Sequence, residues 1–474
     1  MSDRKFYITT TLPYVNAPPH IGFALELVEA DILARYHNLL GEEVFFNTGT
    51  DEHGVKVYRK SQEEGNDPKA YVDKYAENFR HLMEVLNISA RRFVRTTDSE
   101  HMAAAQAFWK LCAKNGDIEK KLYKTKYCAG CELEKTDSEL KGGRCPLHPN
   151  FEIEIIEEEN YFFKFSKYQR PLLEFYAKNP DFVVPEFRFN EIRRFVDGGL
   201  NDFSISRLAA KMPWGVPVPD DPSHVMYVWF DALVSYISTL GWPKNQENFK
   251  AFWPGLQIAG KDQIRQQAAM WQAMLISAGL PKSKQIIIHG FINVGGSKIS
   301  KSLGNVVDPF ALVAKYGADA VRFWLAHEVQ MFEDSDFTED KFKEGYNANL
   351  ANGLGNLVAR IMALAEMYLP KPILQPKPGE FPKEYTAALD TYDLKKAIDF
   401  VWSRVAALDQ KIADTEPFKV LKADLENGRT LLTELVVELY WIGRMLYPFM
   451  PEANVTIKKT ILENKKPPTL FPRV

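Results

Sequence analysis

The stretch TLPYVNAPPHIGFALE, residues 11–26, joins two segments of different character. Before it, residues 6–10 read FYITT, and this β-branched and aromatic run is typical of a strand. After it, apolar residues recur at helical spacing from 25 to 39 and stop at Gly41. The amide groups and dipole at the start of a helix favour an anion. The stretch therefore predicts a strand-to-helix turn that can hold a charged ligand.

The overall composition sets the broad class of the protein. A chain of 474 residues is too long to fold around a single hydrophobic core, so about two to four domains are expected. There are 59 basic and 62 acidic residues, giving a net charge of −3, so any nucleic-acid contact needs a local basic patch. No long apolar run and no apolar leader occur, and there are only four cysteines. We expect a cytoplasmic protein with no membrane segment and no disulfide scaffold.

The order of patterns along the chain predicts an interrupted α/β fold. Strand and helix patterns alternate through the first 115 residues and resume with a strand at Met226–Trp229. Further strands are expected at 43–48, 92–94, 256–259 and 285–288. We expect four segments: the first half of an α/β domain (1–116), an insert (117–224), the second half (225–325) and a helical region (326–474).

The helical region is predicted to form a bundle. Its apolar stripe over 350–364 has the spacing of a helix that packs in a core. The proline-containing stretch 369–382 predicts a loop, and helices are expected over 391–412 and 418–446.

The insert contains a metal-site pattern, YCAGCELEKTDSELKGGRCPLHPN. Cys128 and Cys131 are separated by two residues, and Cys145 and His148 repeat that spacing. Two such turns supply the four tetrahedral ligands of a closed zinc site. Because no ligand position stays open, we predict a structural zinc ion. The fourth cysteine, Cys112, lies in an apolar helical pattern and is expected in the core.

A second constellation, GGSKISKSLGN at 295–305, follows a predicted strand. Its glycines flank Lys298 and Lys301, two cations that a loop could close over a polyphosphate. The segment is not a Walker A loop, because it lacks the order G-x-x-x-x-G-K-[ST].

Together, PPHIGF and KISKS resemble the HIGH and KMSKS signatures of the class I aminoacyl-tRNA synthetases, and the whole chain resembles the methionyl-tRNA synthetases. The features that select this branch are LPYVNAPPHIG, TGTDEHG, the zinc knuckle, DFSISR, YVWFDALVSY, AGKD and NANLANGLGNL. The resemblance implies an α/β fold: a Rossmann-like catalytic domain split by a zinc-bearing connective insert, followed by an all-α anticodon-binding bundle. The spacing of the two signatures leaves no room for a large editing domain.

The resemblance also implies a reaction and its partners. ATP and L-methionine form methionyl-adenylate and pyrophosphate with Mg²⁺, and the methionyl group then moves to tRNA(Met). Catalysis consists of positioning and charge stabilisation during attack on the α-phosphate. A monomer is expected.

Site residues follow from the matching motif positions. The catalytic group is His20, Lys298 and Lys301, and Phe23 replaces the second histidine of HIGH. The ATP-binding group is His20, Gly22, Arg207, Gly260, Asp262, Ser300, Lys301 and Ser302. The methionine-binding group is Leu12, Tyr14, Asp51, Trp229, Ala232, Leu233, Tyr236, Gln263 and Gln267, of which Gln267 replaces a family histidine. The anticodon group is Asn349, Asn352 and Phe418.

Two alternative interpretations remain at this point. A class I synthetase for another small amino acid, cysteine first, would use its zinc to bind the substrate thiolate at the active site. A synthetase-like paralogue would bind RNA without catalysis, an idea that Phe23 and the two glutamines favour and that His20, Asp51 and Lys301 oppose.

Overall fold

The centre of the molecule is a six-stranded parallel sheet. In this computed structural model, which describes residues 4–131, 133–299, 305–376 and 379–474, the strand order is β3-β2-β1-β12-β13-β7. The strands are β1 (Lys5–Thr9), β2 (Glu43–Thr50), β3 (Arg92–Arg95), β7 (Val183–Val184), β12 (Leu256–Gly260) and β13 (Gln285–His289). Chain order reverses between β1 and β12, which is the point where ligands bind in open parallel sheets.

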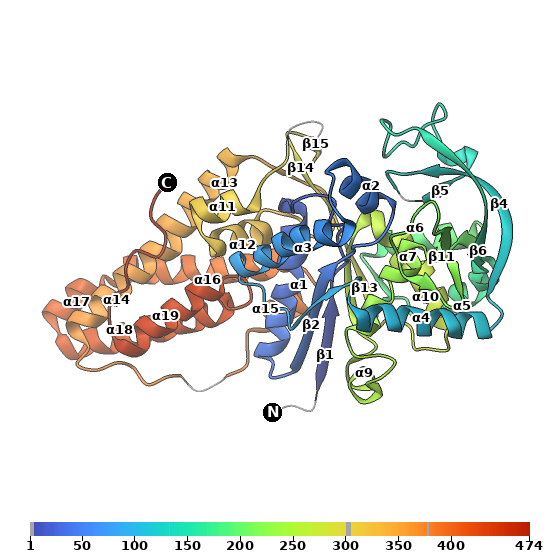
Figure 1. The fold of residues 1–474 in the computed structure, drawn as a ribbon. Coiled ribbons are helices and arrows are strands. Elements are labelled where there is room, and N and C mark those ends of the chain that lie inside the picture. Colours follow the sequence, from blue (N-terminus) through green and yellow to red (C-terminus); the bar gives the residue numbers. More distant parts are fainter. Residues whose placement is uncertain (1–3, 132, 300–304, 377–378) are drawn as a thin grey trace.

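Alternate side chains of β1 enter two different cores. Phe6 and Ile8 pack with α1 (Ile21–Leu39) and α12 (Ala318–His327), whereas Tyr7 packs with α4 (Ser99–Lys114) and α10 (Trp271–Ser277). Both faces of the sheet are therefore covered, as parallel sheets require (Figure 1). The other helices around the sheet are α2 (Val55–Glu63), α3 (Pro68–Val85), α8 (Ser235–Ser238), α9 (Gln246–Phe252) and α11 (Pro309–Tyr316), with a short 3-10 helix at Lys261–Gln263 and a π-helix at Gln266–Met270.

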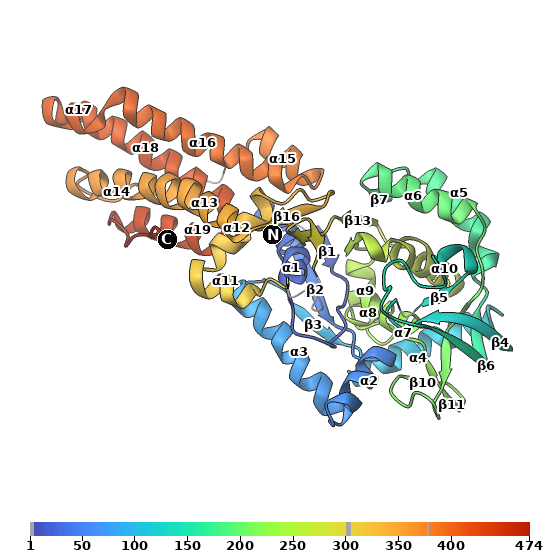
Figure 2. The same ribbon diagram turned by 90° about the horizontal axis from the view of Figure 1, so that it is seen from above.

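The insert forms a separate mass beside the sheet, opposite the helical bundle (Figures 1 and 2). One of its sheets has the order β5-β4-β6-β8, and the other has the order β10-β11-β9. These strands are β4 (Ile118–Cys128), β5 (Leu133–Lys135), β6 (Ile153–Phe163), β8 (Phe203–Ser204), β9 (Ser206–Leu208), β10 (Pro217–Val218) and β11 (Asp221–Met226). Its helices are α5 (Gln169–Lys178) and α6 (Glu186–Asp197), with short turns at Asp137–Glu139 and Phe165–Tyr168.

One predicted strand is wrong. Met226 ends β11 of the insert, and the following residues form the short helix α7 (Val228–Ala232) rather than a strand of the central sheet. All the residues of Met226–Trp229 are buried, and a short buried apolar run has no period that separates helix from strand. The insert also contributes β7 to the edge of the central sheet, which the sequence pattern did not indicate.

A small third sheet precedes the helical bundle. It consists of β14 (Ile292–Val294), β15 (Ser297–Lys298) and β16 (Ser335–Phe337). The bundle contains α13 (Glu339–Gly345), a π-helical stretch (Tyr346–Gly355), α14 (Asn356–Tyr368), α15 (Lys383–Asp390), α16 (Leu394–Thr415), α17 (Pro417–Ala423), α18 (Leu425–Leu446) and α19 (Pro451–Glu463). Among the described residues, the helices are too short or too polar to cross a membrane.

The bundle core confirms the predicted stripe, since Leu350, Leu354, Leu357 and Ile361 are all buried. The single helix expected over 418–446 is wrong, because it breaks at Asp424. That carboxylate accepts a hydrogen bond from the Asn427 amide, which is how an N-cap starts a new helix.

Arg322 of α12 joins the sheet to the bundle. Its guanidinium is fully buried, lies 2.7 Å from the Asp31 carboxylate of α1, and donates to the carbonyls of Leu86, Pro448 and Phe449. The last two carbonyls belong to the turn between α18 and α19. One cation thus satisfies groups from three parts of the chain.

Removing that cation should destabilise the protein strongly. Arg322→Leu leaves the Asp31 carboxylate buried with one cation fewer, so we expect unfolding to become easier by about 3–5 kcal/mol. Denaturant unfolding followed by circular dichroism measures this change. The matched control is Arg360→Leu, which breaks an exposed pair with Asp409 and should cost about 1 kcal/mol or less. Equal losses in the two variants would contradict the assignment.

Candidate functional site

The turn after β1 holds a histidine at the start of α1, as the sequence predicted. His20 is the N-cap residue, and its Nδ1 accepts a hydrogen bond from the Gly22 amide at 3.0 Å. A Cβ on Gly22 would lie 2.8 Å from the His20 ring, so glycine is what allows this close approach. The Ile21 amide donates to the Val307 carbonyl at 3.1 Å, which places the segment after the KISKS loop beside the same helix start.

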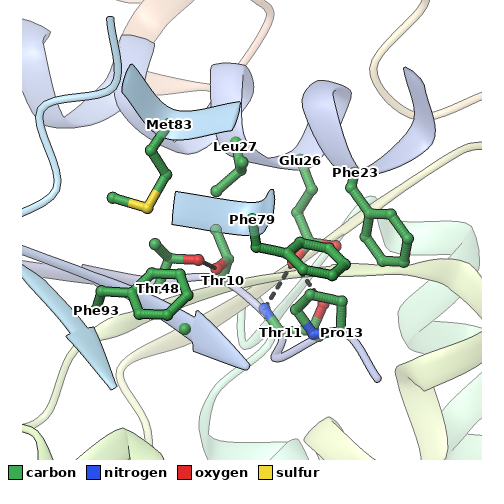
Figure 3. A pocket seen from close by; sticks show the side chains of 11 residues that line it. Thr10, Thr11, Pro13, Phe23, Glu26, Leu27, Thr48, Phe79, Met83 and Phe93 are labelled. Carbon is green, nitrogen blue, oxygen red and sulfur yellow. Dashed lines mark hydrogen bonds between the residues drawn. The ribbon is translucent and has the colours of Figure 1, made fainter. Parts of the chain in front are cut away.

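Phe23, which stands where the family has its second histidine, is a packing residue here. Its ring lies 4.6 Å from the His20 ring and makes an edge contact with Phe79 at 5.5 Å. It lines a small apolar cavity of about 20 Å³, shown in Figure 3, together with Thr10, Thr11, Pro13, Glu26, Leu27, Thr48, Gly49, Phe79, Met83 and Phe93. That volume holds about one water molecule, so the cavity is too small for a nucleotide or an amino acid.

The loops that follow β1 and β2 are joined by hydrogen bonds beside this cavity. The Asp51 amide donates to the Pro13 carbonyl at 2.9 Å, and the Val15 amide donates to the Asp51 carbonyl at 3.3 Å. Asp51 is buried, and the ring of Tyr14 meets that of Trp229 at 6.1 Å. Three of the predicted methionine-binding residues therefore come from three separate elements and lie together.

Gln267 belongs to a buried network of glutamines. Its Nε2 donates to the Tyr236 hydroxyl at 2.5 Å, and its Oε1 accepts from Gln257 at 2.8 Å. Gln272 donates to the Gln267 carbonyl at 2.8 Å and to the Ser283 hydroxyl at 3.0 Å. Both ends of the Gln267 amide are thus used. Gln263 is half-buried one turn earlier, whereas Leu12 is half-buried and Ala232 and Leu233 are buried.

Sequence reasoning missed a buried histidine pair next to Asp51. His53 and His101 each lie within hydrogen-bond distance of the Asp231 carboxylate, at 2.6 and 2.8 Å. Burial alone would raise the pKa of Asp231, but the two imidazoles hold it at about 2. His53 lies in the quoted motif TGTDEHG, and Asp231 lies in YVWFDALVSY. The motifs therefore pointed to these two residues, but they did not show that the residues contact each other.

The predicted nucleotide residues come from several parts of the chain. Gly260 ends β12, and Asp262 follows on an exposed turn. Arg207 is buried in the insert, where its guanidinium lies 4.4 Å from the centre of the Tyr227 ring and donates to the Ser204 hydroxyl. Lys298 ends β15, whereas Ser300, Lys301 and Ser302 lie outside the described residues.

The four predicted metal ligands converge. The ligand atoms of Cys128, Cys131, Cys145 and His148 all lie within 4.8 Å of one another. The Cys131 sulfur is 3.4 Å from that of Cys145 and 3.2 Å from His148 Nδ1. Sulfurs on one tetrahedral zinc would lie roughly 3.8 Å apart, so this donor set fits such an ion. A Cβ on Gly130 would lie 2.4 Å from the His148 ring, so glycine is required between the first two cysteines.

Comparison with known proteins identifies the family. The model of tRNA synthetases class I (M) matches residues 6–362. The chain is 41% identical over 480 residues to the methionine–tRNA ligase of Thermotoga maritima, covering 98% of this chain and 76% of that protein. The chain belongs to the methionyl group of the class I tRNA synthetases. A second member of this synthetase family, the methionine–tRNA ligase of a Nostoc species, is 40% identical over 96% of this chain and 89% of its own length.

The synthetase fold extends over the whole chain. A solved structure of Mycobacterium tuberculosis methionyl-tRNA synthetase in complex with methionyl-adenylate superposes with a TM-score of 0.91 at 34% identity. It covers 99% of this chain and 100% of that one. The α/β class, the knuckle-like cluster and the helical C-terminal region predicted from the sequence are therefore confirmed.

The residues proposed to read an anticodon in this synthetase bundle differ in their surroundings. Asn349 and Asn352 lie in the π-helical stretch, and the Asn352 side-chain oxygen accepts from Arg473 at 2.7 Å. Phe418, in α17, is 43% exposed, which leaves its ring accessible for stacking.

A variant of the knuckle should lose its metal. Cys131→Ser replaces a soft thiolate with a poor ligand, so we expect metal content to fall and the melting temperature to drop. Elemental analysis of the purified protein and thermal unfolding measure both. Cys112→Ser, which alters a buried cysteine outside the cluster, is the control and should keep its metal. Full metal content in Cys131→Ser would refute the ligand set.

Proposed function

We propose that this chain catalyses the ATP-dependent ligation of methionine to tRNA(Met). Methionine and ATP would form methionyl-adenylate and pyrophosphate, and the methionyl group would then pass to the tRNA with release of AMP. The observation that carries this proposal is the 41% identity to a methionine–tRNA ligase across 98% of the chain. The clamp of Asp51 beside Tyr14 and Trp229 at the carboxyl ends of the strands supports it.

The nucleotide would lie across the reversal of strand order, between the end of β1 and the end of β12. His20 and Gly22 at the helix start would face the phosphates and the adenine, and Lys298 and Lys301 would stabilise the charge that develops on the α-phosphate. The remaining proposed contacts to ATP are Arg207, Gly260, Asp262, Ser300 and Ser302. Mg²⁺ would accompany the ATP phosphates.

Methionine would lie beside Asp51, whose buried carboxylate suits an ammonium group. An apolar and aromatic wall suits a thioether, which offers polarisability and little hydrogen bonding. The proposed wall is Leu12, Tyr14, Trp229, Ala232, Leu233 and Tyr236, with Gln263 and Gln267 behind it. Because Gln267 is held on both sides, it would fix the Tyr236 hydroxyl against this pocket.

The insert would stabilise the fold through its knuckle, and the helical bundle would bind tRNA. The four knuckle residues would hold a structural zinc ion, which leaves no open position for chemistry. The domains proposed are 1–116 and 225–325 for catalysis, 117–224 for the insert and 326–474 for anticodon binding by Asn349, Asn352 and Phe418. The protein would act as a monomer in the cytoplasm.

Exchange of labelled pyrophosphate into ATP tests the function directly. We expect exchange that depends on methionine and on no other standard amino acid, because the pocket has an apolar aromatic wall and a carboxylate for the ammonium. Exchange with cysteine alone would identify a different synthetase, and no exchange with any amino acid would identify a binding protein without catalysis. Both results would refute the proposal.

The second lysine of the KISKS loop gives a sharper prediction. Lys301→Ala removes the cation proposed to stabilise the transition state, so exchange should fall by about 10²-fold or more. The control is Lys458→Ala, which removes an exposed lysine of α19 and should leave the rate unchanged. Equal rates in the two variants would show that the loop plays no part in the reaction.

A further inference from the structure

Glu26 and His289 form a buried ion pair between the two halves of the sheet. Glu26 lies on α1, in the first half, and His289 ends β13, in the second half. The Glu26 Oε2 lies 3.0 Å from His289 Nε2, and both side chains are nearly inaccessible to solvent. The two residues are 263 positions apart in the sequence, so the contact exists only in the assembled sheet.

The other carboxylate oxygen of Glu26 holds the loop that follows β1. Its Oε1 accepts from both the amide and the hydroxyl of Thr11, at 2.6 and 2.5 Å. Figure 3 shows Glu26 reaching from α1 to Thr11. Thr11 leads directly into Leu12 and Tyr14 of the proposed methionine pocket. The position of that loop therefore depends on where the Glu26 carboxylate is held.

The geometry around His289 suits an imidazolium ion. His289 Nδ1 lies 2.7 Å from the Gly290 carbonyl, which can only accept a hydrogen bond, and Nε2 faces the Glu26 carboxylate. Both ring nitrogens therefore donate when the Glu26 carboxyl is ionised. Burial would lower the pKa of His289, but the carboxyls of Glu29 and Glu26 raise it to about 9.

A second buried carboxyl, Glu29, interacts electrostatically with this pair. It lies one helical turn beyond Glu26 and is 2% exposed, and its Oε2 has no hydrogen-bond partner among the described residues. Burial raises the pKa of Glu29 to about 8, although His289 opposes that rise.

His289 also lies next to the proposed nucleotide position. It pairs in register with Gly260, and its ring carbon Cε1 is 3.7 Å from the place that a Cβ on Gly260 would occupy. The same side chain thus borders the end of β12 and contacts Glu26, which accepts hydrogen bonds from the loop after β1.

We propose that His289 is a positioning residue for adenylate formation, which fixes the first half of the site against the second by holding Glu26 and, through it, Thr11. The proposal rests on the function proposed above. In-line attack on a phosphate requires the methionine carboxylate and the nucleotide to meet in one geometry, and a displacement of about 1 Å can cost about 10²-fold in rate. Loss of the pair should therefore lower kcat more than it raises either KM.

Kinetics of two variants in pyrophosphate exchange test the proposal. His289→Phe keeps a planar ring but donates no hydrogen bond, and kcat should fall by about 10²-fold with KM for ATP and methionine nearly unchanged. His289→Gln retains one donor for Glu26 and should recover part of the rate. The control is His224→Gln, which changes a buried histidine of the insert and should keep the wild-type rate.

Three results would overturn it: a wild-type kcat in His289→Phe, a rise confined to KM, or a loss in both variants that matches the unfolded fraction seen by thermal melting. Nitrogen-15 shifts of histidine-labelled wild-type protein give an answer independent of activity, with the His289 signal assigned by its loss in His289→Gln. Protonation of both nitrogens at pH 7 is expected, and a neutral ring would refute the pair. Lack of exchange in the wild type would refute the proposed function, and the nitrogen shifts would still decide the pairing.

Discussion

The parallel pairing of β1 with β12 is the constraint on which the rest of the structure depends. Ile8 opposes Leu256 across this ladder, although a whole insert separates the two strands in the chain. Because parallel strands end at a common edge, the pairing brings the loop with His20, the loop with Asp51 and the end of β12 together. The insert and the bundle can then lie on opposite sides of the sheet without separating these loops.

Three of the polar groups buried near this edge are held by protein partners. Asp231 lies between two histidines, Glu26 lies between Thr11 and His289, and the Gln267 amide is used at both ends. Buried polar groups without partners are costly, so such networks define one arrangement of the loops. Phe23 brings no polar group that would need a partner: its ring packs against Phe79 at the position where the family has a histidine.

Much of the fold and part of the site could be predicted from the sequence. The strands at 43–48, 256–259 and 285–288 follow from short apolar runs, and the stripe at 350–364 follows from helical periodicity. The cysteine spacing indicated the four residues whose ligand atoms converge. The misassigned segment Met226–Trp229 is another short apolar run that is buried throughout, and such a run fits a helix as well as a strand. The break at Asp424 has no clear sign in the sequence, because a carboxylate that can cap a helix also fits within a polar helix face.

By itself, the sequence determined the alternation of strands and helices, the position of the insert, the cluster of three cysteines and a histidine, and the two signature segments, because each of these is encoded in the spacing of neighbouring residues. Only the tertiary structure decided that an insert strand joins the central sheet, that His53 and His101 share one carboxylate, and that Glu26 meets His289. These contacts join residues far apart in the chain. Their energies depend on burial and on distances of a few ångströms, and neither quantity has a local signature in the sequence.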